Sequence, residues 1–133
     1  MSPRILVAED SATFGRPLQR TLEIAGYEVS VVATAEEALR TLQRGDTDLV
    51  LTDIRLPGMD GLTLLRRIKT EYPPVPVIVM TARGSTDTAA DVAALGAADY
   101  FVKPFEPSKL VDAVGRALAR PADRTVATAR RHA

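Results

Sequence analysis

Three acidic residues, one lysine and one threonine stand at the ends of short apolar runs in the sequence. Glu9 and Asp10 follow the first run, and Asp53, Thr81 and Lys103 follow three later ones. If the runs are parallel strands of one sheet, these side chains gather along its carboxyl edge, where open α/β sheets bind ligands. Three carboxylates that meet in a partly dry cleft repel one another unless a cation neutralises them. The pattern therefore predicts a hard divalent ion, and Mg²⁺ fits best because it takes oxygen ligands, keeps several waters and shares its shell with carboxylates and a phosphate.

Asp53 is the candidate nucleophile of this set. A carboxylate can form an acyl phosphate, and phosphoryl transfer needs mainly positioning and compensation of charge. The Lys103 ammonium and the Thr81 hydroxyl would supply both on the side of Asp53 away from the metal. The sequence thus predicts a site that holds a phosphoryl group on Asp53.

Two arginines and a tyrosine lie close to these residues along the chain. Arg55 stands two residues after Asp53, and Arg83 stands two residues after Thr81. They are either solvated loop charges or residues that border the site and tune the access of water or a partner. Tyr100 is in the last apolar run, where an aromatic is usually packed but could switch between two positions. Its apolar neighbours are expected in the core: Phe101, Val102 and Phe105.

The elements that must position these side chains alternate along the chain. Five apolar runs, at residues 5–8, 29–32, 49–51, 75–80 and 100–102, are separated by segments with helical periodicity. This alternation predicts a single doubly wound α/β domain with a five-stranded parallel sheet and five helices. With the strand order 2-1-3-4-5, the first and third strands are neighbours and their three carboxylates converge. The run at 29–32 belongs to an alternating segment and is expected at the sheet edge.

Several residues predict where the helices begin and end. Thr34 and Glu37 have the spacing of a capping box, and Gly26 is a plausible stop for a first helix that starts near residue 12 or 13. Pro17 then falls in about the first turn of that helix, where its missing N–H costs little. Residues 121–133 have little apolar content and no period, so we expect a domain at 1–120 and a flexible tail or linker stub beyond it.

Composition excludes several classes of protein. The chain has 133 residues, 17 basic and 17 acidic residues, and no cysteine. A net charge of zero gives no electrostatic reason to bind nucleic acid or an anionic membrane. The lack of cysteine excludes a disulfide framework and a thiolate metal site. No apolar run approaches the length needed to span a bilayer, so a cytoplasmic protein without direct nucleic acid or membrane binding is the simplest expectation.

The ordered set of motifs resembles one protein family. The motifs are Glu9-Asp10, LTDIRLPGMDG at 51–61, MTA at 80–82 and YFVKPF at 100–105. Together they closely resemble the receiver (chemotaxis-regulator-like) domain of bacterial two-component response regulators, which has a flavodoxin-like fold. The resemblance covers about residues 4–119. No single motif is specific, whereas their order and completeness are.

The resemblance implies a role for each site residue. Asp53 would be the phosphoacceptor, Asp10 a direct Mg²⁺ ligand and Glu9 an outer ligand through water. The family often has aspartate where this chain has Glu9, and the extra methylene matters less in a water-bridged role. The backbone carbonyl of Arg55 would be a further metal ligand, and Thr81 would supply the switch hydroxyl. Lys103 would be the lysine that pairs with the phosphate, and Tyr100 would be the switching aromatic. The family also has a cis peptide bond at the position of Lys103-Pro104.

The implied function is a phosphorylation-controlled switch, and two other functions remain open. In the switch, a sensor histidine kinase or a histidine phosphotransfer protein supplies the phosphoryl group, and the surface of the fourth helix, fifth strand and fifth helix changes its affinity for a partner. The domain would assist its own phosphorylation and dephosphorylation without being an enzyme. The alternatives are a scaffold that works without phosphate and an aspartyl-phosphate phosphatase, which commonly has a second aspartate where this chain has Arg55.

Two forms of the protein would give such a switch an output. The chain is either a stand-alone regulator or the N-terminal piece of a longer protein, and a phosphorylation-dependent dimer is a further possibility. The segment at 84–89 resembles receivers attached to transcriptional activators, which favours the longer protein.

Overall fold

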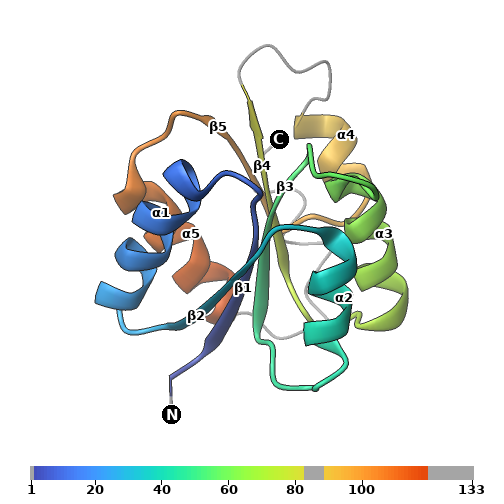
Figure 1. Ribbon diagram of the computed structural model, residues 1–133, viewed down its shortest axis with the longest axis horizontal. Helices are drawn as coiled ribbons and strands as arrows, with labels where there is room; N and C mark the ends of the chain where they lie inside the picture. Colours follow the sequence, from blue (N-terminus) through green and yellow to red (C-terminus); the bar gives the residue numbers. More distant parts are fainter. Residues whose placement is uncertain (1, 83–88, 120–133) are drawn as a thin grey trace.

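Five strands and five helices alternate along the part of the chain that the computed structural model describes, residues 2–82 and 89–119 (Figure 1). The strands form one sheet in the order β2-β1-β3-β4-β5, and every neighbouring pair is parallel. This confirms the predicted doubly wound α/β fold and its strand order. The elements are β1 (Arg4–Ala8), α1 (Ala12–Ile24), β2 (Glu28–Val32), α2 (Ala35–Leu42), β3 (Leu49–Asp53), α3 (Gly61–Glu71), β4 (Val77–Ala82), α4 (Ala89–Ala94), β5 (Asp99–Lys103) and α5 (Pro107–Ala119).

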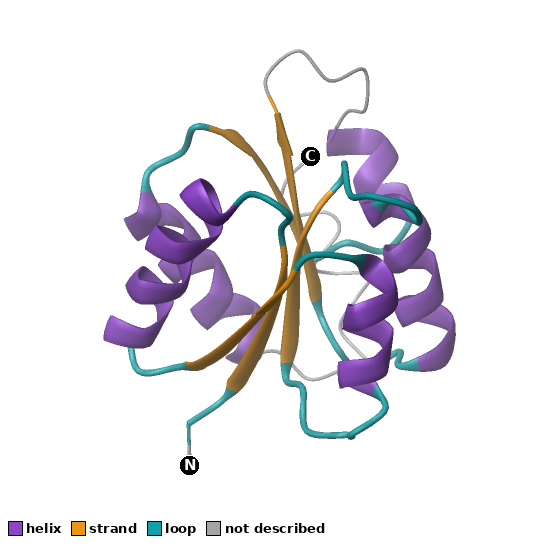
Figure 2. Cartoon of the chain, viewed as in Figure 1, coloured by secondary structure: helices purple, strands orange, loops and turns teal. Residues whose placement is uncertain are grey.

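The helices cover both faces of the sheet. Helices α1 and α5 lie on one face, and α2, α3 and α4 lie on the other (Figures 1 and 2). Successive side chains of a strand point to opposite faces, so Ile5 and Val7 join the core under α1 and α5, whereas Leu6 and Ala8 join the core under the other three helices. Strand β3 lies in the middle and is buried along its whole length. The chemistry-bearing residues therefore project from a rigid sheet that is packed on both sides.

The predicted helix signals coincide with the observed ends. Helix α1 begins at Ala12, and Thr34 caps α2 by accepting the backbone N–H of Glu37 at 3.1 Å. Gly26 has a φ of 104°, a backbone conformation that glycine adopts without strain. Pro17 is the sixth residue of α1 and therefore lies just past the first turn of the helix.

Two details differ from the sequence-based expectation. Strand β4 begins at Val77 and not at residue 75, because the Val75 backbone N–H donates to the Tyr72 carbonyl in a turn and Pro76 has no N–H to give. Val102 is 42 % exposed, although it was expected in the core. It lies on the same face of β5 as Tyr100, and β5 is an edge strand.

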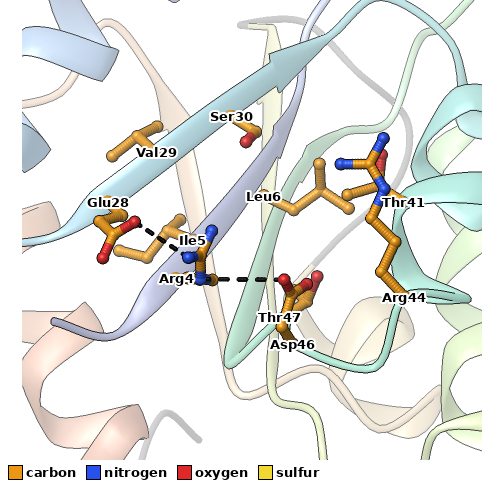
Figure 3. Close-up of a pocket in the computed structure, with 10 residues that line it drawn as sticks. All are labelled: Arg4, Ile5, Leu6, Glu28, Val29, Ser30, Thr41, Arg44, Asp46 and Thr47. Atoms are coloured by element: carbon orange, nitrogen blue, oxygen red, sulfur yellow. Dashed lines mark ion pairs between the residues drawn. The ribbon is translucent and has the colours of Figure 1, made fainter. Parts of the chain in front are cut away.

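The amino edge of the sheet carries a small pocket of about 110 Å³ (Figure 3). Arg4 at the start of β1 forms ion pairs there with Glu28 at 3.3 Å and with Asp46 at 3.8 Å. Its backbone N–H also donates to the Asp48 carboxylate at 2.7 Å. These contacts tie β1 to β2 and to the loop before β3, at the end of the sheet opposite the predicted site.

Candidate functional site

Strand register brings Glu9 and Asp53 together at the carboxyl edge of the sheet. Strand β1 pairs with β3 so that Ala8 is level with Thr52. The residues that follow, Glu9 and Asp53, therefore leave two neighbouring strands at the same height. Lys103 is the last residue of β5, separated from β3 by β4, and its long side chain covers that distance.

Lys103 joins the two carboxylates. Its Nζ atom donates to Glu9 Oε1 and to Asp53 Oδ2, each at 2.5 Å. The side chains of Glu9, Asp53 and Lys103 are 1 %, 10 % and 18 % exposed. Charges this far from water interact strongly but also lose hydration, so each needs the others to stay charged.

Burial and pairing shift two pKa values in this trio. Burial raises the pKa of Glu9 above its ordinary value of 4.5, and the hydrogen bonds from Lys103 and from the Ser11 backbone offset only part of that rise. Burial alone would lower the pKa of Lys103, but its hydrogen bonds to Asp53 and Glu9 outweigh burial and raise the pKa overall. Lys103 is therefore held firmly as an ammonium ion.

Backbone N–H groups orient both carboxylates. Asp53 Oδ1 accepts the N–H of Arg55 at 3.2 Å, while its other oxygen faces Lys103. Glu9 Oε2 accepts the N–H of Ser11 at 3.0 Å. The Asp53 carboxylate is thus fixed by a donor on each oxygen at the edge where a ligand would approach.

The other predicted site residues lie around this trio. Asp10 is exposed beside Glu9, and the Arg55 side chain is exposed beyond Asp53. Thr81 is buried near the end of β4, one residue past the strand partner of Asp53, and its hydroxyl donates to the Ala82 carbonyl at 3.5 Å.

Two more predictions concern the ends of β4 and β5. Tyr100 is half-buried and packs against the core on the side of α2, α3 and α4. The Lys103-Pro104 peptide bond is cis, as the family resemblance implies. Arg83 and the predicted tail at 121–133 lie outside the described residues.

The loop from β3 to α3 approaches the Asp53 backbone very closely. The N–H of Gly61 donates to the Ile54 carbonyl at 2.7 Å, and a Cβ atom on Gly61 would overlap the Asp53 carbonyl oxygen. From the other side, Glu36 of α2 accepts the Met59 N–H at 3.4 Å. Glycine at 61 is therefore required for space.

The donor set fits a hard divalent cation. Glu9 and Asp53 already share one cation, the Lys103 ammonium, and both offer oxygen ligands. Within residues 2–82 and 89–119, no three acidic or histidine side chains form a ready-made metal cage. Mg²⁺ needs no such cage, because it binds through one or two carboxylates and keeps several waters. Asp10 beside Glu9 adds a further carboxylate at the solvent side.

The family to which these features belong follows from comparison with known proteins. The family model described as the response regulator receiver domain matches residues 5–115. The chain belongs to this family. Among curated relatives, the response regulator protein FleR of Pseudomonas aeruginosa is 45% identical over 116 residues, which is 87% of this chain and 24% of FleR. The DNA-binding transcriptional regulator NtrC of Rhizobium meliloti is 42% identical over 117 residues, 88% of this chain and 24% of NtrC. This receiver domain thus spans about a quarter of the length of these relatives.

Solved receiver structures have the same fold. A response regulator receiver domain protein from Clostridium thermocellum superposes with a TM-score of 0.82 at 33% identity, over 87% of this chain and 94% of the other. The chemotaxis response regulator CheY4 of Vibrio cholerae gives 0.79 at 28% identity, over 88% and 99%. The receiver fold in the described residues contains no helix that is long and apolar enough to cross a membrane.

Sequence reasoning missed three features of this receiver site. It did not predict that Lys103 contacts Glu9 as well as Asp53, or that Gly61 lies directly against the Asp53 backbone. It also did not predict that the centroid of the Phe14 ring lies 4.0 Å from Lys103 Nζ. The only sequence signal for that contact is an aromatic four residues after Asp10 at the start of a helix.

Proposed function

We propose that Asp53 of this receiver domain accepts a phosphoryl group from a phosphohistidine on a sensor histidine kinase or a histidine phosphotransfer protein. The observation that carries the proposal is the hydrogen bond from Lys103 to Asp53 at the carboxyl edge, in a chain of the receiver family. A fixed carboxylate beside a buried ammonium is suited to attack phosphorus and to hold the product. The proposal places the domain in the cytoplasm with its phosphodonor.

In the transfer step, an Asp53 carboxylate oxygen attacks the phosphorus atom of the donor. A P–O bond forms, the P–N bond breaks, and the bond electrons leave with the donor imidazole, which takes up a proton. The product is an acyl phosphate on Asp53. Lys103 compensates the charge of the phosphoryl oxygens, and the Arg55 N–H keeps the carboxylate oriented.

Mg²⁺ is the proposed cofactor of this step. When bound, it neutralises charge on the phosphoryl group and on the carboxylates. Asp10, Asp53 and the Arg55 backbone carbonyl would be direct ligands, and Glu9 an outer ligand through water. The charge of the site supports this assignment, because the single Lys103 ammonium balances only one of the two buried carboxylates.

The proposed output is a change of the surface formed by α4, β5 and α5. Phosphate on Asp53 would recruit Thr81 and Lys103, and Tyr100 would turn inward from its half-buried position. A partner or an attached effector domain would bind the altered surface, or two receivers would dimerise through it. NtrC-like relatives are DNA-binding transcriptional regulators, so an effector of that class is the favoured output. Arg55 and Arg83 would tune the access of water and partner.

Acetyl phosphate labelling of Asp53→Asn tests the proposal. The wild-type domain should gain one phosphoryl group with Mg²⁺ and none with EDTA, measured by intact mass, and Asp53→Asn should gain none. Asp60→Asn is the matched control. Asp60 lies in the same loop, but its Oδ1 atom caps α3 by accepting the backbone N–H of Thr63 at 2.8 Å. It should label like the wild type.

Other outcomes would contradict the proposal. Undiminished Mg²⁺-dependent labelling of Asp53→Asn would place the phosphate elsewhere. A wild-type domain that is never labelled but still binds its partner would be a phosphate-independent scaffold. Many cycles of hydrolysis of a small phosphate ester per molecule would indicate a phosphatase.

A further inference from the structure

An aromatic ring lies against the ammonium group at the centre of the site. Nζ of Lys103 is 4.0 Å from the centroid of Phe14, which projects from the first turn of α1. A cation over the face of a ring is attracted by the ring quadrupole, and more strongly when water is excluded. Lys103 is largely buried here, so the contact belongs to the stronger kind.

Two further phenylalanines hold the Phe14 ring in place. Phe105 packs edge-on against Phe14 with ring centroids 5.8 Å apart and an interplanar angle of 77°. Phe101 packs on Phe105 with centroids 5.1 Å apart. Phe101 and Phe105 flank Lys103 in the chain by two residues on either side. Lys103 and the two phenylalanines that support the Phe14 ring therefore come from one segment, residues 101–105. Phe14 packs against this segment from α1.

The ring complements the two carboxylates. An ammonium group has three N–H donors, and Lys103 directs two of them to Glu9 and Asp53. The Phe14 face is the third contact. A bound Mg²⁺ would share the negative charge of these two carboxylates, so the contacts of Lys103 with them would weaken. The ring contact depends on neither carboxylate and would persist.

We propose that Phe14 is a positioning residue that keeps the Lys103 ammonium beside Asp53 through this cation–π contact. The inference rests on the proposed phosphoacceptor function and adds to it a residue that touches neither phosphate nor metal. Its action passes through Lys103 alone. Aromatic character, and not only bulk, is therefore what position 14 must supply.

The test compares three substitutions at this position. Phe14→Leu keeps an apolar side chain but removes the ring, whereas Phe14→Tyr and Phe14→Trp keep a ring face. We expect Phe14→Leu to take up phosphate from acetyl phosphate and Mg²⁺ about five-fold more slowly, and the two aromatic variants to stay within about two-fold of the wild type. Tyr27→Leu is the matched control, because Tyr27 packs on the same core cluster as Phe14 but lies near Gly115 of α5. It should label at the wild-type rate.

A second measurement needs neither metal nor phosphate. The chain has only three lysines, Lys69, Lys103 and Lys109, so their side-chain NMR signals are readily resolved after labelling at Cε. The ring current of Phe14 should shift the Lys103 Hε signals upfield of those of exposed Lys109. The shift should disappear in Phe14→Leu, persist in the aromatic variants and persist in Tyr27→Leu.

The outcomes separate this inference from the proposed function. Lys103 signals that do not move in Phe14→Leu, or a Phe14→Leu domain that labels like the wild type, would overturn the positioning role. Equal slowing in all three Phe14 variants would also overturn it, because the loss would then follow packing and not the ring. A wild-type domain that takes up no phosphate would instead refute the phosphoacceptor function, whatever the NMR shifts show.

Discussion

The two edges of the sheet carry the same arrangement of charge in different surroundings. At the carboxyl edge, Lys103 bridges Glu9 and Asp53 at 2.5 Å each in a largely buried setting. At the amino edge, Arg4 bridges two acidic residues, Glu28 at 3.3 Å and Asp46 at 3.8 Å. The three side chains of the amino-edge trio are about half exposed. One basic residue between two acids is thus present at both ends.

Burial decides what each trio can do. Exposed ion pairs gain little, because water screens the charges and holding long side chains in place costs entropy. A buried charge loses its hydration energy. It is retained only where well-oriented partners compensate that loss or where the function of the site needs the charge. Arg4 therefore acts as a weak tie between strands, whereas the Lys103 trio keeps a nucleophilic carboxylate and a cation together away from water. Four experiments test this difference.

The largest effect is expected from glycine substitutions at the two edges. Gly61→Ala should lower the free energy of unfolding by about 3 kcal/mol or more, because a Cβ atom there would overlap the Asp53 backbone. Gly45→Ala, in the α2–β3 loop at the amino edge, should cost about 1 kcal/mol, because its φ is +81° but the space around it is open. Urea unfolding of both variants measures the difference. Equal losses would mean that the loop beside Asp53 is not tightly packed.

Removal of the buried cation should have the next largest effect. Lys103→Met keeps a side chain of similar length but leaves two buried carboxylates facing each other, so we expect a loss of about 2 kcal/mol at pH 7 in EDTA. Added Mg²⁺ should recover part of the loss, since it replaces the missing charge. Thermal unfolding with and without Mg²⁺ gives both values. A variant as stable as the wild type in EDTA would show that the carboxylates are adequately hydrated.

The raised pKa of Glu9 predicts how the trio responds to pH. The folded protein binds the Glu9 proton more tightly than the unfolded chain does, so this stabilisation is complete below the ordinary pKa of 4.5 and is lost as pH rises through the folded value. Glu9→Gln removes that loss. In EDTA it should be more stable than the wild type at pH 7, by about 1 kcal/mol, and the gap should close toward pH 4. A gap that widens in acid would reverse the sign and contradict burial as the dominant cause.

The smallest effect is expected at the exposed trio. Arg4→Met should lower the free energy of unfolding by less than about 1 kcal/mol, and added salt should reduce even this difference because it screens exposed charges. Denaturant titrations at low and high ionic strength measure both. A loss as large as that of Lys103→Met would remove the distinction between the edges.

The alternation of apolar runs and helical segments was enough to predict the fold, because burial on both faces leaves a clear pattern in the sequence. Residues whose backbone sets a helix end, such as Thr34 and Gly26, were also readable. The approach of Glu9 to Asp53 follows from strand order. The bond between Lys103 and Glu9 does not, because it joins residues 94 positions apart through two flexible side chains.

Packing between distant elements explains the other features that sequence reasoning missed. The place of Phe14 under Lys103 depends on how α1 packs against the segment after β5, which periodicity does not encode. The exposure of Val102 has a similar origin, since an apolar residue on an edge strand has the same local pattern whether or not a helix covers it.

The tight contact at Gly61 bears on how relatives of this chain are compared. The clash that forbids a side chain there comes from the main chain of residue 53, so it would persist whatever amino acid replaced the aspartate. A descendant that had lost phosphate chemistry would still need glycine at the start of α3 as long as it kept this loop. Lys103 has no such backbone constraint, so it can be replaced once its charge is no longer used and the carboxylates that it neutralises have also changed. Surveys for inactive members of the family should therefore look at the end of β5, because the glycine reports only that the loop before α3 is kept.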